Sequence, residues 1–142
     1  TGFYSEHLIT QEIKPGGRVL VNNYDSQRRV TQQQATVGPK SALAINATFQ
    51  YFNTKNADGT LTGYTNVIDA YNRTTRYDYS GSQLTKTTDP LGQTEQTAWY
   101  QPGDTSSGAY QRSLKQRIDK RGLSVTYKYD ANGNLVETDT TG

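Results

Sequence analysis

The sequence predicts an all-β fold built from antiparallel β-hairpins, and three observations carry this prediction. Its 142 residues include 21 Thr and 11 Tyr, whereas Leu, Ile, Val and Phe together number only 24. Thr and Tyr favour strands, so this composition fits a Tyr- and Thr-rich sheet better than a thick aliphatic core. Asp-x-x-Gly segments recur, and short stretches of alternating apolar and polar residues lie between them. No segment has the periodicity of an amphipathic helix.

Composition and charge exclude several classes of function. The 15 Lys and Arg residues against 13 Asp and Glu give a net charge of +2, which is too small for a protein that binds nucleic acid mainly through its phosphates. The chain has no Cys, so disulfides, thiolate metal sites and a Cys nucleophile are excluded. No apolar run approaches the ~18 residues of a membrane span.

The Asp-x-x-Gly pattern is the first sign of a repeat. The Asp residues lie 20, 30 and 20 positions apart, and Lys14–Gly17 is a degenerate fifth copy. Asp at the first position can accept backbone N–H groups two or three residues on, and Gly or Asn at the last position tolerates positive φ. Each copy therefore predicts a turn between strands. The predicted turn residues are Asp69, Asn72, Asp89, Gly92, Asp119, Gly122, Asp139 and Gly142.

Aromatic residues recur in step with these turns. Seven residues after the last turn residue of four copies stand Tyr24, Tyr79, Trp99 and Tyr129. In the stretch 124–129, the alternation places Val125, Tyr127 and Tyr129 on one face of a strand, and Tyr77 and Tyr79 are equivalent in an earlier copy. We expect these aromatic rows to supply cross-strand pairs that hold the sheet together.

Each repeat is predicted to be a strand, a tight turn, a return strand and an Asp-x-x-Gly turn. Asp130 and Gly133 delimit one tight turn, and residues 79–82 and 56–59 are its expected counterparts. Asn-Gly and Asp-Gly between alternating strands are strong hairpin signals. The chain is expected to be a single repeat segment over 1–142 and part of a larger protein. Its expected order is a degenerate repeat at 14–34, a connection at 35–48, and repeats at 49–142 with a loop insertion near 100–113.

The repeats resemble those of the Rhs or YD-repeat family. The matching strings are residues 24–31 (YDSQRRVT), 73–79 (RTTRYDY), 88–94 (TDPLGQT) and 129–135 (YDANGNL). The resemblance covers residues 14–34 and 49–142. In this sequence Arg28 stands where the family's turn usually has Gly, and Tyr79-Ser80 replaces the Tyr-Asp pair of that register.

The resemblance implies a role as a structural wall. YD repeats build a long antiparallel sheet that spirals into a hollow shell. In bacteria the shell encloses a toxic C-terminal domain, as in polymorphic toxins and the cocoon of insecticidal toxin complexes, whereas in animal teneurins a related shell serves adhesion. The implied protein is a non-enzymatic wall segment of a secreted bacterial toxin, outside the cell or at the bacterial surface. Its implied partners are adjacent YD repeats of the same or neighbouring chains and an encapsulated toxin domain.

Sites with chemistry of their own have weaker support in the sequence. Asp89–Gly92 resembles part of the family's autocleavage site, but Gln93 follows where the cleaving motif continues with Leu, so a plain turn is expected. His7 is the single histidine, which argues against a hydrolytic triad and against zinc. Asp130–Asn134 is similar to a calcium loop, yet its Gly lies at position four rather than six. Because the Asp residues recur with the turns, turn formation explains them better than acid–base catalysis does. We expect no enzyme activity, no cofactor and no metal.

A second reading stays open. Arg73, Arg76, Tyr77 and Tyr79 interleave aromatic and basic side chains, which permits stacking on sugars. The alternative function is an extracellular adhesion or carbohydrate-binding sheet that binds glycans. A hairpin ribbon also has two open edges, whose unpaired N–H and C=O groups recruit further strands. We therefore expect the edges to pair with more of the same polypeptide or with other copies.

Overall fold

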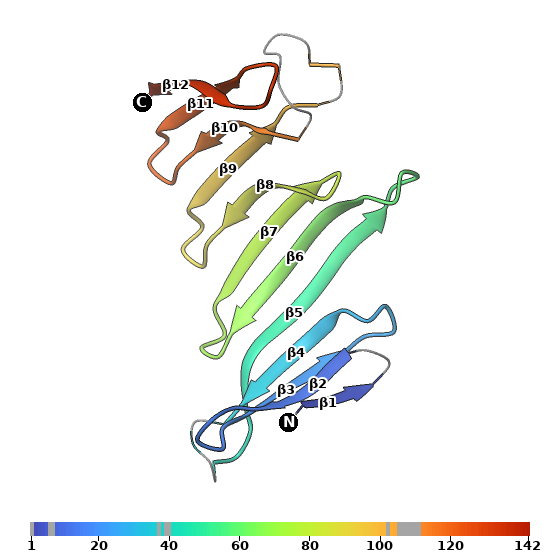
Figure 1. Cartoon of the computed structure of the whole chain (residues 1–142). Helices are drawn as coiled ribbons and strands as arrows, with labels where there is room; N and C mark the ends of the chain where they lie inside the picture. Colours follow the sequence, from blue (N-terminus) through green and yellow to red (C-terminus); the bar gives the residue numbers. More distant parts are fainter. Residues whose placement is uncertain (1, 6–7, 37, 39–40, 102, 105–111) are drawn as a thin grey trace. The chain divides into compact units, whose positions relative to one another are not determined.

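The computed structural model describes residues 2–5, 8–36, 38, 41–101, 103–104 and 112–142 (Figure 1). These residues form twelve strands and no helix, which confirms the predicted all-β class. The strands follow one another in the sheet in chain order, as consecutive antiparallel hairpins do. They are β1 (Gly2–Ser5), β2 (Leu8–Ile13), β3 (Val19–Tyr24), β4 (Val30–Ala35), β5 (Ala44–Lys55), β6 (Leu61–Asp69), β7 (Thr74–Ser80), β8 (Gln83–Thr88), β9 (Thr94–Trp99), β10 (Leu114–Ile118), β11 (Ser124–Tyr129) and β12 (Leu135–Thr141).

The chain forms two compact units, each of which is described by itself. The first comprises residues 1–51 and 65–75, and the second comprises residues 52–64 and 76–142. Strands β5, β6 and β7 contribute residues to both units, so no linker separates them in the sequence.

In the first unit, amide side chains form a ladder across three strands. The Gln33 side chain of β4 donates to Asn22 Oδ1 of β3 at 3.2 Å. The Asn46 side chain of β5 donates to the side-chain oxygen Oε1 of Gln33 at 2.9 Å. Asn23 and Gln32, directly opposite each other, are joined at 3.2 Å. Hydrogen bonds between polar side chains, rather than an apolar cluster, thus connect these strands on this part of the sheet.

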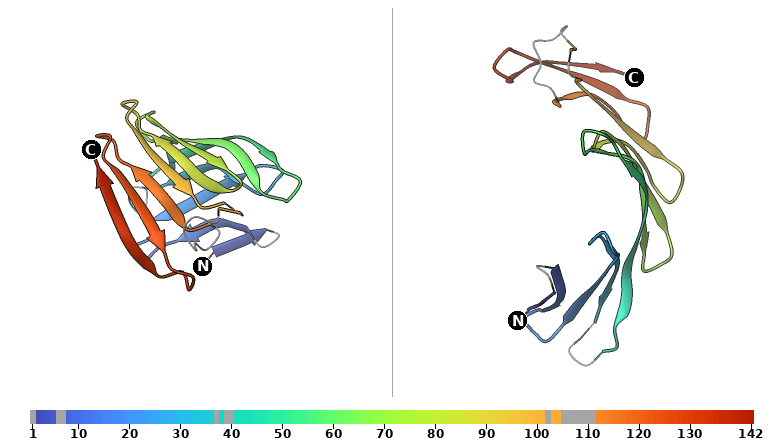
Figure 2. Two further views of the ribbon diagram at one scale, coloured as in Figure 1. Left: turned by 90° about the horizontal axis from the view of Figure 1, so that it is seen from above. Right: turned by 90° about the vertical axis from the view of Figure 1, so that its right-hand side faces the viewer.

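In the second unit, short turns join most of the consecutive strands. Strands β7 and β8 are joined by Gly81 and Ser82, whose φ values of 57° and 61° define a type I′ hairpin turn. β11 and β12 lie side by side in Figures 1 and 2 and pair from Ser124↔Thr141 to Tyr129↔Leu135. Their alternation matches the strand, turn and return strand that the sequence predicts.

The described residues enclose very little core. Among them only Tyr100, at 5% exposure, is buried, and no polar or charged side chain is. Large apolar side chains remain open to solvent, including Leu91 at 85%, Tyr71 at 80% and Val136 at 62%. A folded domain normally surrounds many fully buried side chains with neighbours on all sides. Ladder hydrogen bonds, turns and half-buried side-chain contacts therefore hold these strands together.

Gly63 in β6 allows a close approach of the neighbouring strand. Its φ is +143°, and a Cβ there would overlap the Phe52 carbonyl oxygen and lie 2.7 Å from the Asn53 Cα. Because both atoms belong to the β5 backbone, no side-chain rotation relieves the overlap. Only Gly fits at this position.

Two predicted boundaries are wrong. The connection at 35–48 is shorter than expected, because β5 already begins at Ala44 and pairs there with Ala35. The tight turn predicted at 79–82 lies one residue later, since β7 continues through Ser80. The regular I′ turn needs only two central residues, whereas the Asp-containing turns span five.

The fourth Asp-x-x-Gly copy does not form a turn. Asp139 lies in β12 opposite Thr126, and the strand continues to Thr141, next to Gly142. In the other copies the Asp N–H donates to the carbonyl four residues on. Asp139 instead pairs with Thr126 of β11 within the ladder.

Candidate functional site

Seven turns share one pair of backbone hydrogen bonds. The first residue donates its N–H to the carbonyl four residues on, and the fourth residue donates to the carbonyl of the first. In the turn that starts at Asp89, these bonds measure 2.9 Å to Gln93 and 2.9 Å from Gly92. The geometry is that of a hairpin loop with a left-handed fourth residue. The first residues of the seven turns are Lys14, Asp25, Asn56, Asp69, Asp89, Asp119 and Asp130.

The five turns that begin with Asp use the carboxylate in the same way. Oδ1 accepts the N–H groups of the second and fourth residues after the Asp, all within 2.8 to 3.0 Å. Oδ2 accepts a side-chain donor, such as Arg73 at 2.8 Å for Asp69 or Asn134 at 3.0 Å for Asp130. The calcium-like loop at Asp130 therefore fills its carboxylate oxygens with hydrogen-bond donors.

These hydrogen bonds keep the turn carboxylates ionised. Hydrogen bonds from Lys120, and then from the N–H groups of Gln93 and Leu91, lower the pKa of Asp89 below its ordinary value. Arg73 does the same for the pKa of Asp69. The pKa is lowered in all five turns, at Asp25, Asp69, Asp89, Asp119 and Asp130. A general acid at neutral pH needs a raised carboxyl pKa, so this arrangement suits turn stabilisation rather than proton transfer.

The fourth turn residue adopts positive φ whether or not it is glycine. Gly92, Gly122 and Gly133 have φ values of 81°, 86° and 83°. Asn72 has φ 59° and Arg28 has φ 63°. The departure from the family pattern at Arg28 therefore leaves the turn intact, at the expense of a strained backbone.

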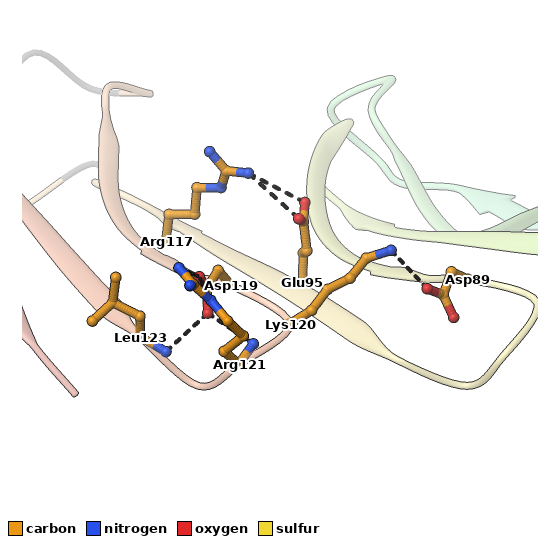
Figure 3. A network of polar contacts seen from close by, with 7 residues as sticks. All are labelled: Asp89, Glu95, Arg117, Asp119, Lys120, Arg121 and Leu123. Atoms are coloured by element: carbon orange, nitrogen blue, oxygen red, sulfur yellow. Dashed lines mark hydrogen bonds and ion pairs between the residues drawn. The ribbon is translucent and has the colours of Figure 1, made fainter.

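Charged side chains connect neighbouring turns and strands in the second unit, as Figure 3 shows. Lys120, in the turn between β10 and β11, reaches back to Asp89 in the turn between β8 and β9, with Nζ–Oδ2 at 2.6 Å. Arg117 of β10 contacts Glu95 of β9 at 3.4 Å. Because these pairs are largely solvated, each contributes little by itself, and their effect is to favour one order of neighbouring turns.

The predicted aromatic residues occupy one register position. Tyr24, Tyr79, Trp99 and Tyr129 lie opposite Val30, Leu84, Leu114 and Leu135. Directly next to each of these pairs the register shifts by one, so that one residue of the partner strand has no residue opposite it. These extra residues are β-bulges, which leave the backbone ladder locally incomplete. They are Thr31, Thr85, Lys115 and Val136.

Aromatic donors fill the gaps in the ladder. Tyr24 Oη donates to the Ile9 carbonyl at 2.7 Å, Trp99 Nε1 to Leu84 at 2.6 Å, and Tyr129 Oη to Leu114 at 3.0 Å. Each acceptor directly precedes the extra residue of a bulge, in the strand before the aromatic one. Each of these carbonyls lies beyond the last paired residue of its ladder with the next strand, so the aromatic residue supplies a hydrogen bond that this ladder does not. Burial, more than the neighbouring Tyr127 and Tyr100, raises the pKa of the Tyr129 hydroxyl.

The structure gives the other predicted aromatic residues different roles. Tyr79 shares the register position, and its hydroxyl accepts a hydrogen bond from Asn53 at 2.7 Å. Tyr127 offers its carbonyl to the Tyr100 hydroxyl at 2.8 Å. Tyr77 lies in β7 opposite Thr87 and is 36% exposed.

Two aromatic residues were missed by sequence reasoning. Tyr51 donates to the Val30 carbonyl at 2.7 Å, the same contact in a strand that no Asp-x-x-Gly turn precedes. Tyr100 is the one buried side chain in the described part of the chain, and its backbone closes the base of the loop insertion by pairing with Arg112 and Ser113 at 3.0 Å. Residues 102 and 105–111 of that insertion lie outside the described residues. Tyr51 lies within β5, where no turn motif marks it, and Tyr100 directly follows Trp99 at the end of β9.

Several arginines lie over aromatic rings. The Arg76 guanidinium is 3.6 Å from the Tyr64 ring centroid and also pairs with Asp78 at 2.6 Å. Phe52 stacks with the same Tyr64 ring at 4.8 Å. Arg76, one of the residues that suggested a stacking platform, is thus engaged within the protein itself.

One open depression lies in the second unit. It has a volume of about 440 Å³ and is lined by Trp99 together with polar side chains that include Asp58, Gln101 and Arg112. Its lining thus combines one aromatic ring with several hydrogen-bonding side chains.

Metal and membrane sites were also considered. Within the described ranges, no group of three or more His, Asp or Glu side chains converges to hold a metal ion. His7 lies outside the described residues. The described part of the chain forms no helix long and apolar enough to cross a membrane. Compared with models of known protein families, the chain matches none, and no curated protein matches it either.

Proposed function

We propose that this chain is a structural, non-enzymatic wall segment of an Rhs/YD-repeat β-shell, which encloses a C-terminal toxin or effector in a secreted bacterial toxin. The observation that carries the proposal is the recurrence of one hairpin design in both units. Asp25 and Asp130 close equivalent turns, and Tyr24 and Tyr129 make equivalent carbonyl contacts. These positions coincide with the strings that resemble the YD repeat.

The scarcity of enclosed core supports a segment of a larger protein. With Tyr100 as the only buried described residue, the sheet has large apolar side chains to cover, such as Leu91 and Val136. Further repeats and an enclosed domain would cover such surface in a shell. The saturated turn carboxylates support a structural role rather than catalysis.

The test is to express the full reading frame that contains this stretch and to digest the product with a nonspecific protease. If the segment belongs to a closed wall, the region that follows the repeats resists digestion in the intact protein and is cleaved when expressed alone. Equal digestion of the two forms, or a reading frame without further repeats, contradicts the proposal.

The alternative, an extracellular sheet for adhesion or carbohydrate binding, is favoured by the depression beside Trp99. A glycan array with the isolated chain tests it. The matched variant is Arg112→Gly, because Arg112 has φ 77° and Gly preserves that backbone. Glycan binding that falls in the variant supports this alternative, whereas an array without any specific signal contradicts it.

A further inference from the structure

The edge strand β12 repeats the acceptor position of the other bulges. Tyr129 lies opposite Leu135, and Lys128 lies opposite Glu137, so Val136 is the extra residue. Leu135 therefore corresponds to Ile9, which precedes the bulge of β2 and accepts a hydrogen bond from the aromatic residue of the next strand. For β12 there is no following strand in this sequence.

The carbonyl of Leu135 faces the open side of β12. Asp130 and Asn134 close the turn with a 2.9 Å N–H to carbonyl bond. In an antiparallel pair, the next residues along, here Tyr129 and Leu135, direct their backbone groups away from each other. Among the described residues, no side chain donates to this carbonyl, and all seven residues of β12 are exposed. Leu135 itself is 53% exposed.

The register of the known contacts shows at which position of the next strand the donor to such a carbonyl stands. Gln11 lies opposite Val21, so extending the ladder places Asn23 opposite the acceptor Ile9, and the donor Tyr24 is the next residue. Extension of the β4–β5, β8–β9 and β10–β11 pairings gives the same one-residue offset for Tyr51, Trp99 and Tyr129.

We propose that the β12 edge binds a further antiparallel strand of this chain's own repeat type, which places a Tyr or Trp one residue beyond the position opposite Leu135. The aromatic hydroxyl or indole N–H donates to the Leu135 carbonyl and selects the register. Continuity with the existing strand order favours this occupant, because β12 ends a series in which each described bulge acceptor faces the next strand. The inference deepens the proposed wall function and rests on it.

The experiment adds the strand as a peptide to the intact chain. The probe is a synthetic peptide with the sequence of residues 119–129, which ends on Tyr129, and its partner carries Phe at that last position. Backbone amide NMR signals of the full chain report where each peptide binds. We expect shifts confined to β12 and adjacent β11, with the Tyr peptide binding about threefold to tenfold more tightly, the effect of one neutral hydrogen bond.

Other results overturn the inference. Equal affinity of the two peptides shows that the hydroxyl does not select the register, although the wall proposal survives, because strand pairing itself is intact. Shifts spread over other strands, or a chain that already pairs β12 with the β12 of a second copy in sizing and NMR, overturn it as well. Failure of the wall proposal is seen separately, in the protease digestion of the full reading frame.

Discussion

At the scale of single residues, the turn aspartates and their left-handed partners define the hairpins. One carboxylate oxygen of Asp89 accepts two backbone N–H groups, and the other accepts Lys120. The same division of labour holds in four further turns. An isolated Asp of this kind could be mistaken for a catalytic acid, but its hydrogen bonds are already committed to the loop. The backbone conformation at the fourth position is the part of the turn most sensitive to residue type.

Arg28→Gly should stabilise the protein. The non-glycine residue at φ 63° is strained, and its removal outweighs the extra freedom that Gly gives the unfolded chain, for a net gain of about 0.5–1 kcal/mol. Urea unfolding measures the change. The control is Gln27→Gly, at a neighbouring position without positive φ, which should lower stability. A loss of stability in Arg28→Gly contradicts the strain argument.

Gly63→Ala should destabilise the protein strongly. The new Cβ collides with the β5 backbone at Phe52 and Asn53, so the strands must separate, at roughly 2–4 kcal/mol. Gly92→Ala is the control, because Gly92 has positive φ but open space around it, and about 1 kcal/mol is expected there. Thermal unfolding compares the two. Equal losses mean that only φ matters and that the close approach does not.

At the scale of elements, a bulge and an aromatic donor act together. The bulge interrupts the ladder near the beginning of each return strand, just after the turn, and the next strand supplies a hydroxyl or indole N–H to the carbonyl before the extra residue. Thr97 and Trp99 both donate to Leu84, and Asn22 and Tyr24 both donate to Ile9. Neighbouring strands are therefore held together by side-chain hydrogen bonds as well as by apolar contacts.

Tyr129→Phe should remove one of these bonds without changing the ring. The Leu114 carbonyl, partly buried, loses its donor, so the free energy of unfolding should fall by about 0.5–1.5 kcal/mol. In Tyr77→Phe the lost hydroxyl has no hydrogen-bond partner among the described residues, and the change should stay within about 0.5 kcal/mol. Denaturant unfolding of both variants is the measurement, and matching values for the two would refute the role of the hydroxyl.

At the scale of the whole molecule, many weak turn and ladder contacts replace a single core. Only Tyr100 is buried among the described residues. Stability should therefore depend on conditions that affect many turns together, above all on the ionisation of the Asp residues.

Acid should unfold the protein through these turns. The folded-state pKa of each turn Asp is below that of the unfolded chain, so its contribution is fully present above the unfolded pKa of about 3.9 and is lost as the pH falls through the lowered folded value. Circular dichroism from pH 6 to about pH 2 follows the loss. Asp69→Asn keeps an acceptor oxygen but removes the titration, so stability should depend less on pH. Asp139→Asn, in a strand, is the control, and an identical flattening there would refute the assignment.

Much of the fold was predictable because turn chemistry is local. Asp69, Asp89 and Asp119 each share one short loop with the N–H groups they accept, so the residue types alone point to the bend. The exact ends of the strands were not predictable to the same degree. Asp139 has the same motif but follows its ladder with β11, a contact with residues more than ten positions away.

The sequence by itself determined the all-β class, the positions of most turns and the spacing of the aromatic residues, because hairpin turns depend on φ preferences and on hydrogen bonds within a few residues. Only the tertiary structure decided that the aromatic residues donate to bulge carbonyls, that Gly63 admits the β5 backbone, and that Lys120 reaches Asp89. These contacts join strands and turns that are distant in the chain, and the register between those strands, which no local preference specifies, brings the atoms together.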